Sequence, residues 1–175
     1  MQQQPQKKKK LTPHDILSIQ PLTRVQEEAF HAFHNHDVLS LLGSAGTGKS
    51  FLACYLALRE VARGEYKRIR IIRSAVPTRD IGFLPGTLEE KEQVYERPYY
   101  SIFDQILNYK SNNYENMKEI GVVNFESTSF MRGETFDNTI VIFDEVQNAS
   151  FQELDTVMTR CGENTKMLFV GDGRQ

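Results

Sequence analysis

One short stretch, GSAGTGKS at residues 43–50, limits the folds open to this chain more than any other segment. It has the spacing G-x-x-x-x-G-K-S, in which backbone N–H groups surround phosphates, the lysine reaches the outer phosphates and the hydroxyl group contacts Mg²⁺. Glycines suit such a loop because they tolerate positive φ angles and let an anion approach bare backbone. The stretch therefore predicts a phosphate-binding site formed by Gly43, Ser44, Ala45, Gly46, Thr47, Gly48, Lys49 and Ser50.

The segments on either side of this loop have the patterns that a phosphate-binding loop requires. VLSLL at 38–42 is a short apolar run and is predicted to be a buried strand. Residues 51–64 are apolar on nearly every side and end at Gly64, which is typical of a helix packed against a sheet and capped by glycine. Strand, glycine loop and buried helix occur in the order of the phosphate-binding unit.

Further strands and helices alternate along the chain. Strands are expected at 68–72, 122–126, 139–145 and 166–170. Helices are expected at 23–33, 87–98, 99–109 and 150–162, with Pro98 interrupting the middle pair. Capping boxes of Thr23 with Gln26, Thr87 with Glu90 and Ser150 with Glu153 mark three of the helix starts. Alternating strands and helices predict an α/β fold whose parallel sheet is covered on both faces and binds ligands at the carboxyl ends of its strands.

The first of these helices has an apolar face. Val25, Ala29 and Phe33 follow one another at four-residue spacing, so we expect all three to face the core. Two cysteines, Cys54 and Cys161, fall within helix-like apolar patterns and are expected to be buried without a metal or disulfide role.

The run TIVIFDE at 139–145 supplies the second half of a nucleotide site. A hydrophobic strand that ends in Asp144 is the Walker B arrangement, in which the aspartate holds the Mg²⁺ that Ser50 also contacts. The next residue, Glu145, would face the terminal phosphate and orient or deprotonate an attacking water. Acidic residues often end strands for structural reasons, but a complete phosphate loop upstream favours a site for nucleoside triphosphate hydrolysis.

The choice of nucleotide and reaction depends on motifs elsewhere in the chain. The sequence holds no N-K-x-D guanine-reading motif, so ATP is expected rather than GTP. One alternative is a nucleotide-dependent binding module that holds ATP, hydrolyses it negligibly and switches a protein partner. A second, weaker alternative is a small-molecule kinase, for which neither a lid nor an acceptor-site pattern stands out.

Composition describes an ordinary soluble domain. The chain has 175 residues, 39% hydrophobic and 25% charged, which suits a single globular domain at 13–175 after a disordered basic tail at 1–12. No apolar run reaches the length of a membrane span and no signal peptide opens the chain, so a cytoplasmic location is expected. The net charge of −2 means that any nucleic-acid site must be a local basic face.

Several short words along the chain resemble one family. Residues from about 20 onward resemble PhoH-type ATPases, which are similar to the first RecA-like domain of superfamily 1 helicases. The matching words are GSAGTGKS (43–50), GFLPG (82–86), the spaced EK…Y…RP (90–98), MRGET (131–135), DEVQN (144–148), TRCG (159–162) and GDGRQ (171–175). The resemblance implies a RecA-like P-loop ATPase that uses ATP and Mg²⁺, with RNA or single-stranded DNA as the expected partner and no nuclease domain. Stand-alone members are common in bacteriophages, which makes a viral origin, and hence the host cytoplasm, plausible.

The resemblance also suggests roles for particular residues. Lys49, Glu145 and Gln175 would be the catalytic set, with Gln175 sensing the γ-phosphate. Gln26 resembles an adenine-reading glutamine, although its capping role explains it equally well. Ser74 departs from the proline usual in relatives.

The same words leave two kinds of contact open. An arginine that completes the site could come from Arg132, Arg160 or Arg174, or from a neighbouring subunit, because the family's domain continues past the position of Gln175. Nucleic-acid contacts by Tyr95, Tyr99 and Tyr100 with Arg97 are an alternative to packing in the core.

Overall fold

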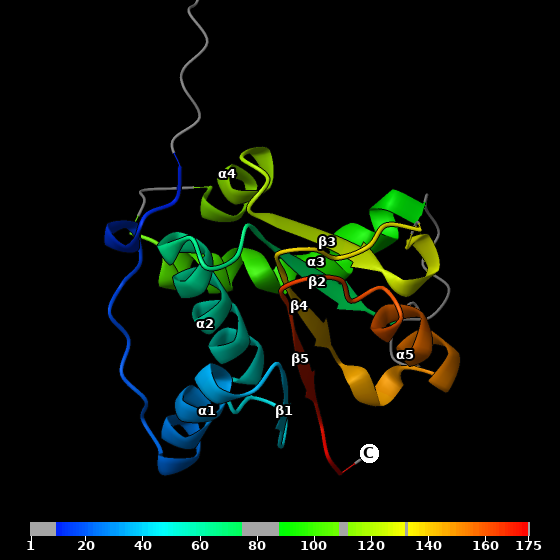
Figure 1. The fold of residues 1–175 in the computed structure, drawn as a ribbon, viewed down its shortest axis with the longest axis horizontal. Coiled ribbons are helices and arrows are strands. Elements are labelled where there is room, and N and C mark those ends of the chain that lie inside the picture. The colour runs from blue at the N-terminus through cyan, green and yellow to red at the C-terminus, as the bar shows by residue number, and fades with distance from the viewer. Residues whose placement is uncertain (1–9, 75–87, 109–111, 132, 175) are drawn as a thin grey trace, which may run out of the picture.

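A computed structural model of the chain describes residues 10–74, 88–108, 112–131 and 133–174. In this part of the chain, five parallel strands form one sheet in the order β1-β5-β4-β2-β3 (Figure 1). The strands are β1 (Val38–Leu42), β2 (Arg68–Arg73), β3 (Val123–Ser127), β4 (Thr139–Asp144) and β5 (Thr165–Gly171). The helices are α1 (Arg24–Asn35), α2 (Lys49–Arg63), α3 (Leu88–Ile106), α4 (Asn113–Glu119) and α5 (Phe151–Met158), with short 3₁₀ turns η1 (Pro13–Asp15), η2 (Thr128–Phe130) and η3 (Val146–Asn148). The predicted α/β fold with a parallel sheet is confirmed.

The two faces of the sheet carry separate cores because successive strand residues point to opposite sides. Ile140 and Ile142 of β4 belong to the larger core, which α2 also lines, whereas Val141 and Phe143 pack in a second core with Val157 of α5. Figure 1 shows α1 and α2 on one side of the sheet and α5 on the other. The sheet is therefore a central layer with both faces covered, as expected for parallel strands.

The sheet order decides which loops meet. β5 lies between β1 and β4, so the phosphate loop after β1 and the carboxylates at the end of β4 flank the end of β5. Leu42 pairs with Gly171, and the N–H of Gly43 donates to the carbonyl of Gly171 at 3.2 Å. The carboxyl ends of three strands thus converge at one edge.

The prediction that residues 38–42 form a buried strand is half right. β1 has the predicted bounds, but Val38 and Leu42 are more than half exposed because β1 lies at the edge of the described sheet. A run of apolar residues indicates a strand, but its place in the sheet depends on pairing with residues 165–171, far along the chain.

The apolar face predicted for α1 is also partly wrong. Phe33 is buried and Ala29 packs against the core, but Val25 is 72% exposed. A four-residue step advances about 40° beyond a full helical turn, so residues eight apart point about 80° away from each other. The core contacts only the C-terminal end of this stripe.

Pro98 does not interrupt a helix as predicted. It lies inside α3, which runs continuously from Leu88 to Ile106. A proline inside a helix removes one backbone hydrogen bond and costs about 3 kcal/mol. Tyr99 and Phe103, which follow in the same helix and are both buried, provide packing that keeps the helix intact.

The helix opened by Ser150 ends earlier than predicted. Its capping box with Glu153 is confirmed, but α5 ends at Met158 rather than near Gly162. Cys161 therefore lies beyond the helix and is exposed, whereas Cys54 in α2 is buried as expected. The glycine cap of α2 is confirmed, since Gly64 adopts a φ of 85°.

Some predictions fall near or beyond the limits of the described residues. Leu11 is buried with 2% exposed, and Thr12 caps η1, so both belong to the packed part although the sequence indicated a tail through residue 12. The GFLPG word, the cap at Thr87, Arg132 and Gln175 lie outside the described residues. None of the helices in the described part is long and apolar enough to cross a membrane.

Candidate nucleotide-binding site

The loop at 43–48 joins β1 to α2 and has the shape that its glycines predict. Gly46 and Gly48 adopt φ angles of 76° and 79°, which L side chains rarely adopt. The hydroxyl of Thr47 and the Nζ of Lys49 both donate to the carbonyl of Ser44, at 2.8 and 2.7 Å. The loop therefore curls around its own lysine, and α2 begins there with its free N–H groups, a favourable place for an anion.

Ser50 and Asp144 meet beside this loop, although they are 94 residues apart. The Oγ of Ser50 donates to Oδ1 of Asp144 at 3.1 Å, and the N–H of Glu145 donates to the same oxygen at 2.9 Å. Asp144 is only 5% exposed. The hydroxyl and carboxylate oxygens are the hard ligands that Mg²⁺ prefers, so this pair fits the predicted metal site.

The described residues offer no larger metal cluster. No group of three or more His, Cys, Asp or Glu side chains in this part of the chain could hold a metal ion. Mg²⁺ commonly binds through one or two protein oxygens together with substrate phosphates. A site built from Ser50 and Asp144 alone matches that pattern.

The second oxygen of Asp144 has a partner that the sequence did not predict. The hydroxyl of Tyr99, from α3, donates to Oδ2 of Asp144 at 2.6 Å. Burial, followed by the charge of Asp144, raises the pKa of Tyr99 well above its ordinary value, so the phenol stays protonated. Tyr99 is 1% exposed and so cannot stack on a nucleic-acid base, which was one of its two predicted roles.

Glu145 turns out of the end of β4 toward the same edge. It adopts a φ of 55°, the left-handed region that non-glycine residues rarely occupy. Its Oε2 accepts a hydrogen bond of 2.5 Å from Nε2 of Gln147, and its Oε1 lies 3.9 Å from Nη2 of Arg73. The carboxylate is 42% exposed, so it is held from two sides yet accessible to water.

Gln147 connects this carboxylate to the end of β5. Its Oε1 accepts the N–H of Asp172 at 3.0 Å. Close approach at this point requires Gly171, because a Cβ there would lie 2.6 Å from Oε1 of Gln147. The amide side chain thus links the ends of β4 and β5.

Arg73 is the other partner that sequence reasoning missed. It ends β2, donates to the carbonyl of Tyr95 at 3.3 Å and lies over the ring of Tyr95 at 5.5 Å. A cation at the carboxyl end of an apolar strand is a usable signal, because ligand sites of parallel sheets form at that edge.

A cavity of about 390 Å³ opens among these residues. Seven predicted site residues line it, namely Ala45, Gly46, Gly48, Lys49, Ser50, Asp144 and Glu145. Gln147 from η3 and, at the end of β5, Gly171 and Asp172 also line it. Gln26 does not line this cavity. The Oγ1 of Thr23 accepts the backbone N–H of Gln26 at 3.2 Å, which is one half of the predicted capping box. The other half is shifted by one residue, since Oε1 of Gln26 accepts from the N–H of Leu22 at 2.7 Å. The adenine contact of Gln26 stays a prediction.

Tyr100, Arg160 and Arg174, which were also candidates, do not line the cavity. Tyr100 donates to Glu115, and its ring lies 4.8 Å from that of Tyr114, as expected for packing rather than for base stacking. The Nη1 of Arg160 is buried without a hydrogen-bond partner among the described residues.

Comparison with known proteins agrees with this geometry. Residues 18–175 match the family described as PhoH-like protein. A PhoH-like protein of Bacillus subtilis is 36% identical over 159 residues, which cover 90% of this chain and 49% of that protein. A PhoH-like protein of Synechocystis is 36% identical over 148 residues, 84% of this chain and 44% of that protein. Protein PhoH of Escherichia coli K12 is 32% identical over 162 residues, 90% of this chain and 46% of that protein.

The chain therefore spans about half the length of these curated relatives. The match to the family covers nearly the whole of this chain and includes every residue of the cavity described above. The chain belongs to the PhoH-like protein family, whose members are predicted P-loop NTPases.

Proposed function

We propose that this protein binds ATP together with Mg²⁺ and hydrolyses it to ADP and phosphate. The observation that carries the proposal is the contact between Ser50 and Asp144 at the mouth of the phosphate loop, 3.1 Å across two elements far apart in sequence. A surface turn or a helix cap would not bring a hydroxyl from the first turn of α2 to a buried strand-end carboxylate.

Each group in the cavity has a part in binding. The loop N–H groups and the Nζ of Lys49 bind the β- and γ-phosphates, for which Lys49 must leave the carbonyl of Ser44. Ser50 and Asp144 would hold Mg²⁺, which would supply positive charge to offset that of the phosphates.

Glu145 supplies the proton acceptor. Water attacks the γ-phosphorus, the bond from that phosphorus to the β,γ-bridging oxygen breaks, and the carboxylate of Glu145 takes the proton that the water loses. Arg73 and Gln147 orient this carboxylate, since each contacts one of its two oxygens. Gln147 also contacts the backbone at Asp172, so the ends of β4 and β5 are linked at the reacting end of the nucleotide.

The proposed hydrolytic site also needs an arginine from outside the described residues that line the cavity. Of the described residues that line the cavity, Lys49 is the one cation, beside the carboxylates of Asp144, Glu145 and Asp172. Nucleotide hydrolases commonly gain about 10³–10⁵ in rate from an added arginine. We expect a neighbouring copy of the chain or another partner to donate it, so specific activity should rise with protein concentration. A fast rate that stays constant on dilution to monomer would contradict this part.

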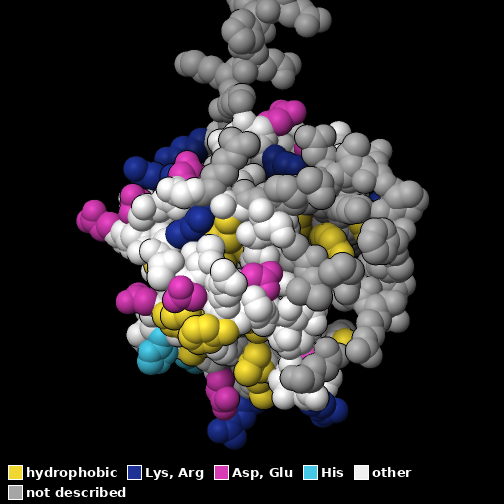
Figure 2. Space-filling model, turned by 90° about the vertical axis from the view of Figure 1, so that its right-hand side faces the viewer, with side chains coloured by type: hydrophobic (Ala, Val, Ile, Leu, Met, Phe, Trp, Pro, Cys, Tyr) yellow, Lys and Arg dark blue, Asp and Glu magenta, His cyan; other side chains and the backbone are white. Residues whose placement is uncertain are grey.

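RNA or single-stranded DNA is the proposed activator. The support for this activator is the resemblance to helicase-like ATPases. On the face in Figure 2, the Lys and Arg side chains of the described residues are interspersed with Asp and Glu side chains. We expect single-stranded RNA or DNA to raise turnover and a duplex of equal length to do so less. An unchanged rate with either strand would remove this part of the proposal.

The test of the proposal combines binding and turnover. ATP binding is measured by calorimetry and phosphate release by a coupled assay, each with Mg²⁺ and with excess chelator. We expect tight binding and turnover only with Mg²⁺. Binding without turnover, even with nucleic acid and at high protein concentration, would instead favour the nucleotide-dependent binding module.

A further inference from the structure

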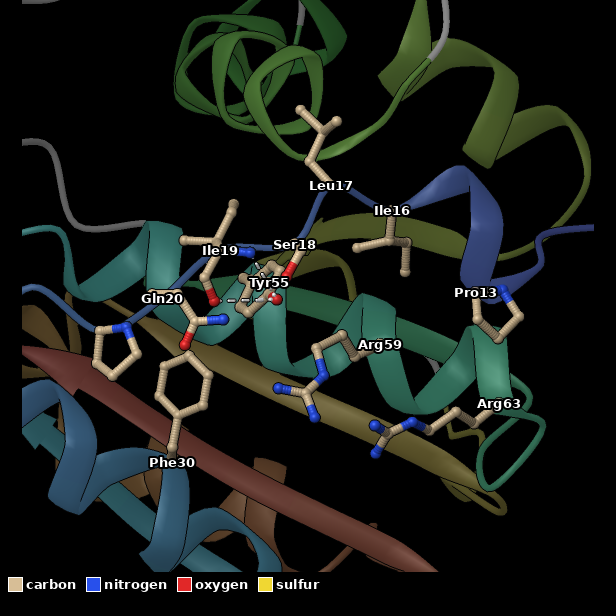
Figure 3. A pocket seen from close by; sticks show the side chains of 11 residues that line it. Pro13, Ile16, Leu17, Ser18, Ile19, Gln20, Phe30, Tyr55, Arg59 and Arg63 are labelled. Atoms are coloured by element: carbon tan, nitrogen blue, oxygen red, sulfur yellow. Dashed lines mark hydrogen bonds between the residues drawn. The ribbon is translucent and has the colours of Figure 1, made fainter.

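A second cavity, of about 410 Å³, lies along α2 away from the nucleotide site. It is bounded by α2, by α1 and by residues 16–21, which we call the strap (Figure 3). The two cavities share no lining residue. Arg59 and Arg63 lie ten and fourteen residues after Lys49 on α2, which places them about 15 and 21 Å along the helix axis from the phosphate loop.

The charge of this cavity is one-sided. Arg59 and Arg63 line it, and no Asp or Glu is among the described residues that do. The whole chain has a net charge of −2, so this local excess of positive charge does not reflect overall composition. Figure 3 shows both arginines on successive turns of α2, with the strap running past Tyr55 on the same helix.

Arg59 has no anionic partner within the described residues. Its guanidinium lies over the rings of Phe30 and Tyr55, at 5.7 and 5.6 Å, and makes no ion pair or hydrogen bond among them. The rings hold the guanidinium in place through cation–π contacts while its N–H groups remain available. Arg63 forms an ion pair with Glu60 through Nη1 at 2.9 Å. Its side chain is 47% exposed, so the other N–H groups of its guanidinium remain accessible to a ligand.

Hydrogen bonds hold the strap against α2 and the end of α3. The hydroxyl of Tyr55 accepts from the N–H of Ile19 at 3.1 Å and donates to the carbonyl of Ile19 at 3.3 Å. The N–H of Leu17 donates to the carbonyl of Ile106 at 2.8 Å. The protein's own hydrogen bonds therefore hold this wall of the cavity in place, which lowers the cost of binding a ligand there.

We propose that this cavity is a second ligand site, for a phosphorylated small molecule whose phosphate group binds Arg59 and Arg63. A phosphate monoester carries up to two charges and three free oxygens, and so can engage both guanidinium forks, whereas a carboxylate is satisfied by one. The volume falls within the range of about 300–1,000 Å³ typical of small-molecule sites. Phe30 and Ile16 provide apolar surface for the rest of the molecule.

The test uses an aromatic phosphate monoester, phenyl phosphate, as the probe. Binding is followed by ligand-observed NMR in the Lys49→Ala protein, so that the phosphate loop does not contribute. We expect phenyl phosphate to bind, phenol not to bind, and Arg59→Gln to weaken binding by about tenfold or more, because a charge-assisted hydrogen bond is lost. Arg24→Gln, an exposed arginine paired with Glu28 on α1, is the matched control and should bind as the parent does.

Two further variants keep the outcome interpretable. Arg63→Gln changes an exposed side chain and should also weaken binding, even if Arg59→Gln fails to fold. Arg59→Lys keeps the charge but not the fork, and should bind weakly. The proposal would be overturned if phenyl phosphate did not bind the parent, or if it bound Arg63→Gln and Arg59→Lys as tightly as the parent.

A separate outcome would assign this face to nucleic acid and also overturn the proposal. In that case these variants would lose binding of single-stranded RNA, and phenyl phosphate would not bind the parent. None of these outcomes depends on ATP hydrolysis.

Discussion

Tyr99 donates a hydrogen bond of 2.6 Å to Oδ2 of Asp144, while Ser50 donates to Oδ1 of the same carboxylate at 3.1 Å. The two contacts come from α3 and α2, whose buried residues pack in the same core, and together they engage both oxygens of the carboxylate. A carboxylate held in this way presents Oδ1 toward the phosphate loop without having to reorganise when a metal binds. Tyr99 is thus a positioning residue that acts through Asp144.

Tyr99→Phe is expected to raise the Mg²⁺ concentration needed for half-maximal ATP hydrolysis. The variant removes a buried hydrogen bond to a charged group, worth about 1.5–3 kcal/mol, and leaves the ring packing in place. The measurement is turnover against Mg²⁺ concentration at saturating ATP. Tyr114→Phe, which removes a buried hydroxyl bonded to Glu96 at 2.9 Å, is the matched control. If both variants shifted the Mg²⁺ curve equally, the contact with Asp144 would have no special role.

Glu145→Gln is expected to bind ATP with Mg²⁺ as the wild type does but to hydrolyse it about 10²–10⁴-fold more slowly. The amide keeps the shape of the side chain and loses the charge that accepts a proton from water. Binding is measured by calorimetry and turnover by phosphate release. Asp144→Asn provides the contrast, because it should weaken the Mg²⁺ dependence of binding itself. Two variants that lost only thermal stability would show that these carboxylates are structural.

The pattern of these contacts explains how far the sequence could lead. The phosphate loop, the strand that ends in Asp144 and the cap at Ser150 are local patterns, so the sequence predicts them within a few residues. The contact between Tyr99 and Asp144 spans 45 residues and depends on how α3 packs, and a single buried tyrosine has no local signal that distinguishes it from ordinary core. Exposure of β1 likewise follows from sheet order, which the apolar run at 38–42 does not encode.

Gln147 and Arg73 lie between these two extremes, because their positions could have been predicted from the sequence but their contacts could not. Both stand at carboxyl ends of strands, where ligand sites form, so they could have been singled out as candidates. Their partners could not, since Gln147 reaches Asp172 only because β5 is inserted beside β4 and has glycine at position 171.

Glu153 should make stability depend on pH. Burial alone would raise the pKa of Glu153, but hydrogen bonds from Thr128, Ser150 and Ser74 outweigh it and lower the pKa from 4.5 to about 2. A carboxyl group whose pKa is depressed on folding contributes stability that is fully present above pH 4.5 and lost as the pH falls toward 2.

Glu153→Gln is therefore expected to lower the urea midpoint at pH 7 and to have less effect as the pH decreases toward 3. The contacts of Glu153 join α5 to residues at the ends of β2 and β3, so the loss is one of folding rather than of nucleotide binding. Glu163→Gln, at an exposed position, is the control and should leave the midpoint nearly unchanged. A destabilisation by Glu153→Gln that is the same at pH 7 and pH 3 would contradict the assignment.

The most direct test of the central claim, that this cavity hydrolyses ATP, is steady-state phosphate release by Lys49→Ala compared with the wild type at saturating ATP and Mg²⁺. Lys49 is the one cation among the described residues that line the cavity. Within the described part of the chain its Nζ donates one hydrogen bond, to the carbonyl of Ser44, so its loss should leave the fold intact. The account predicts a protein with an unchanged circular dichroism spectrum and no turnover above the protein-free background. Undiminished turnover by folded Lys49→Ala protein would show that the reaction does not occur at the phosphate loop.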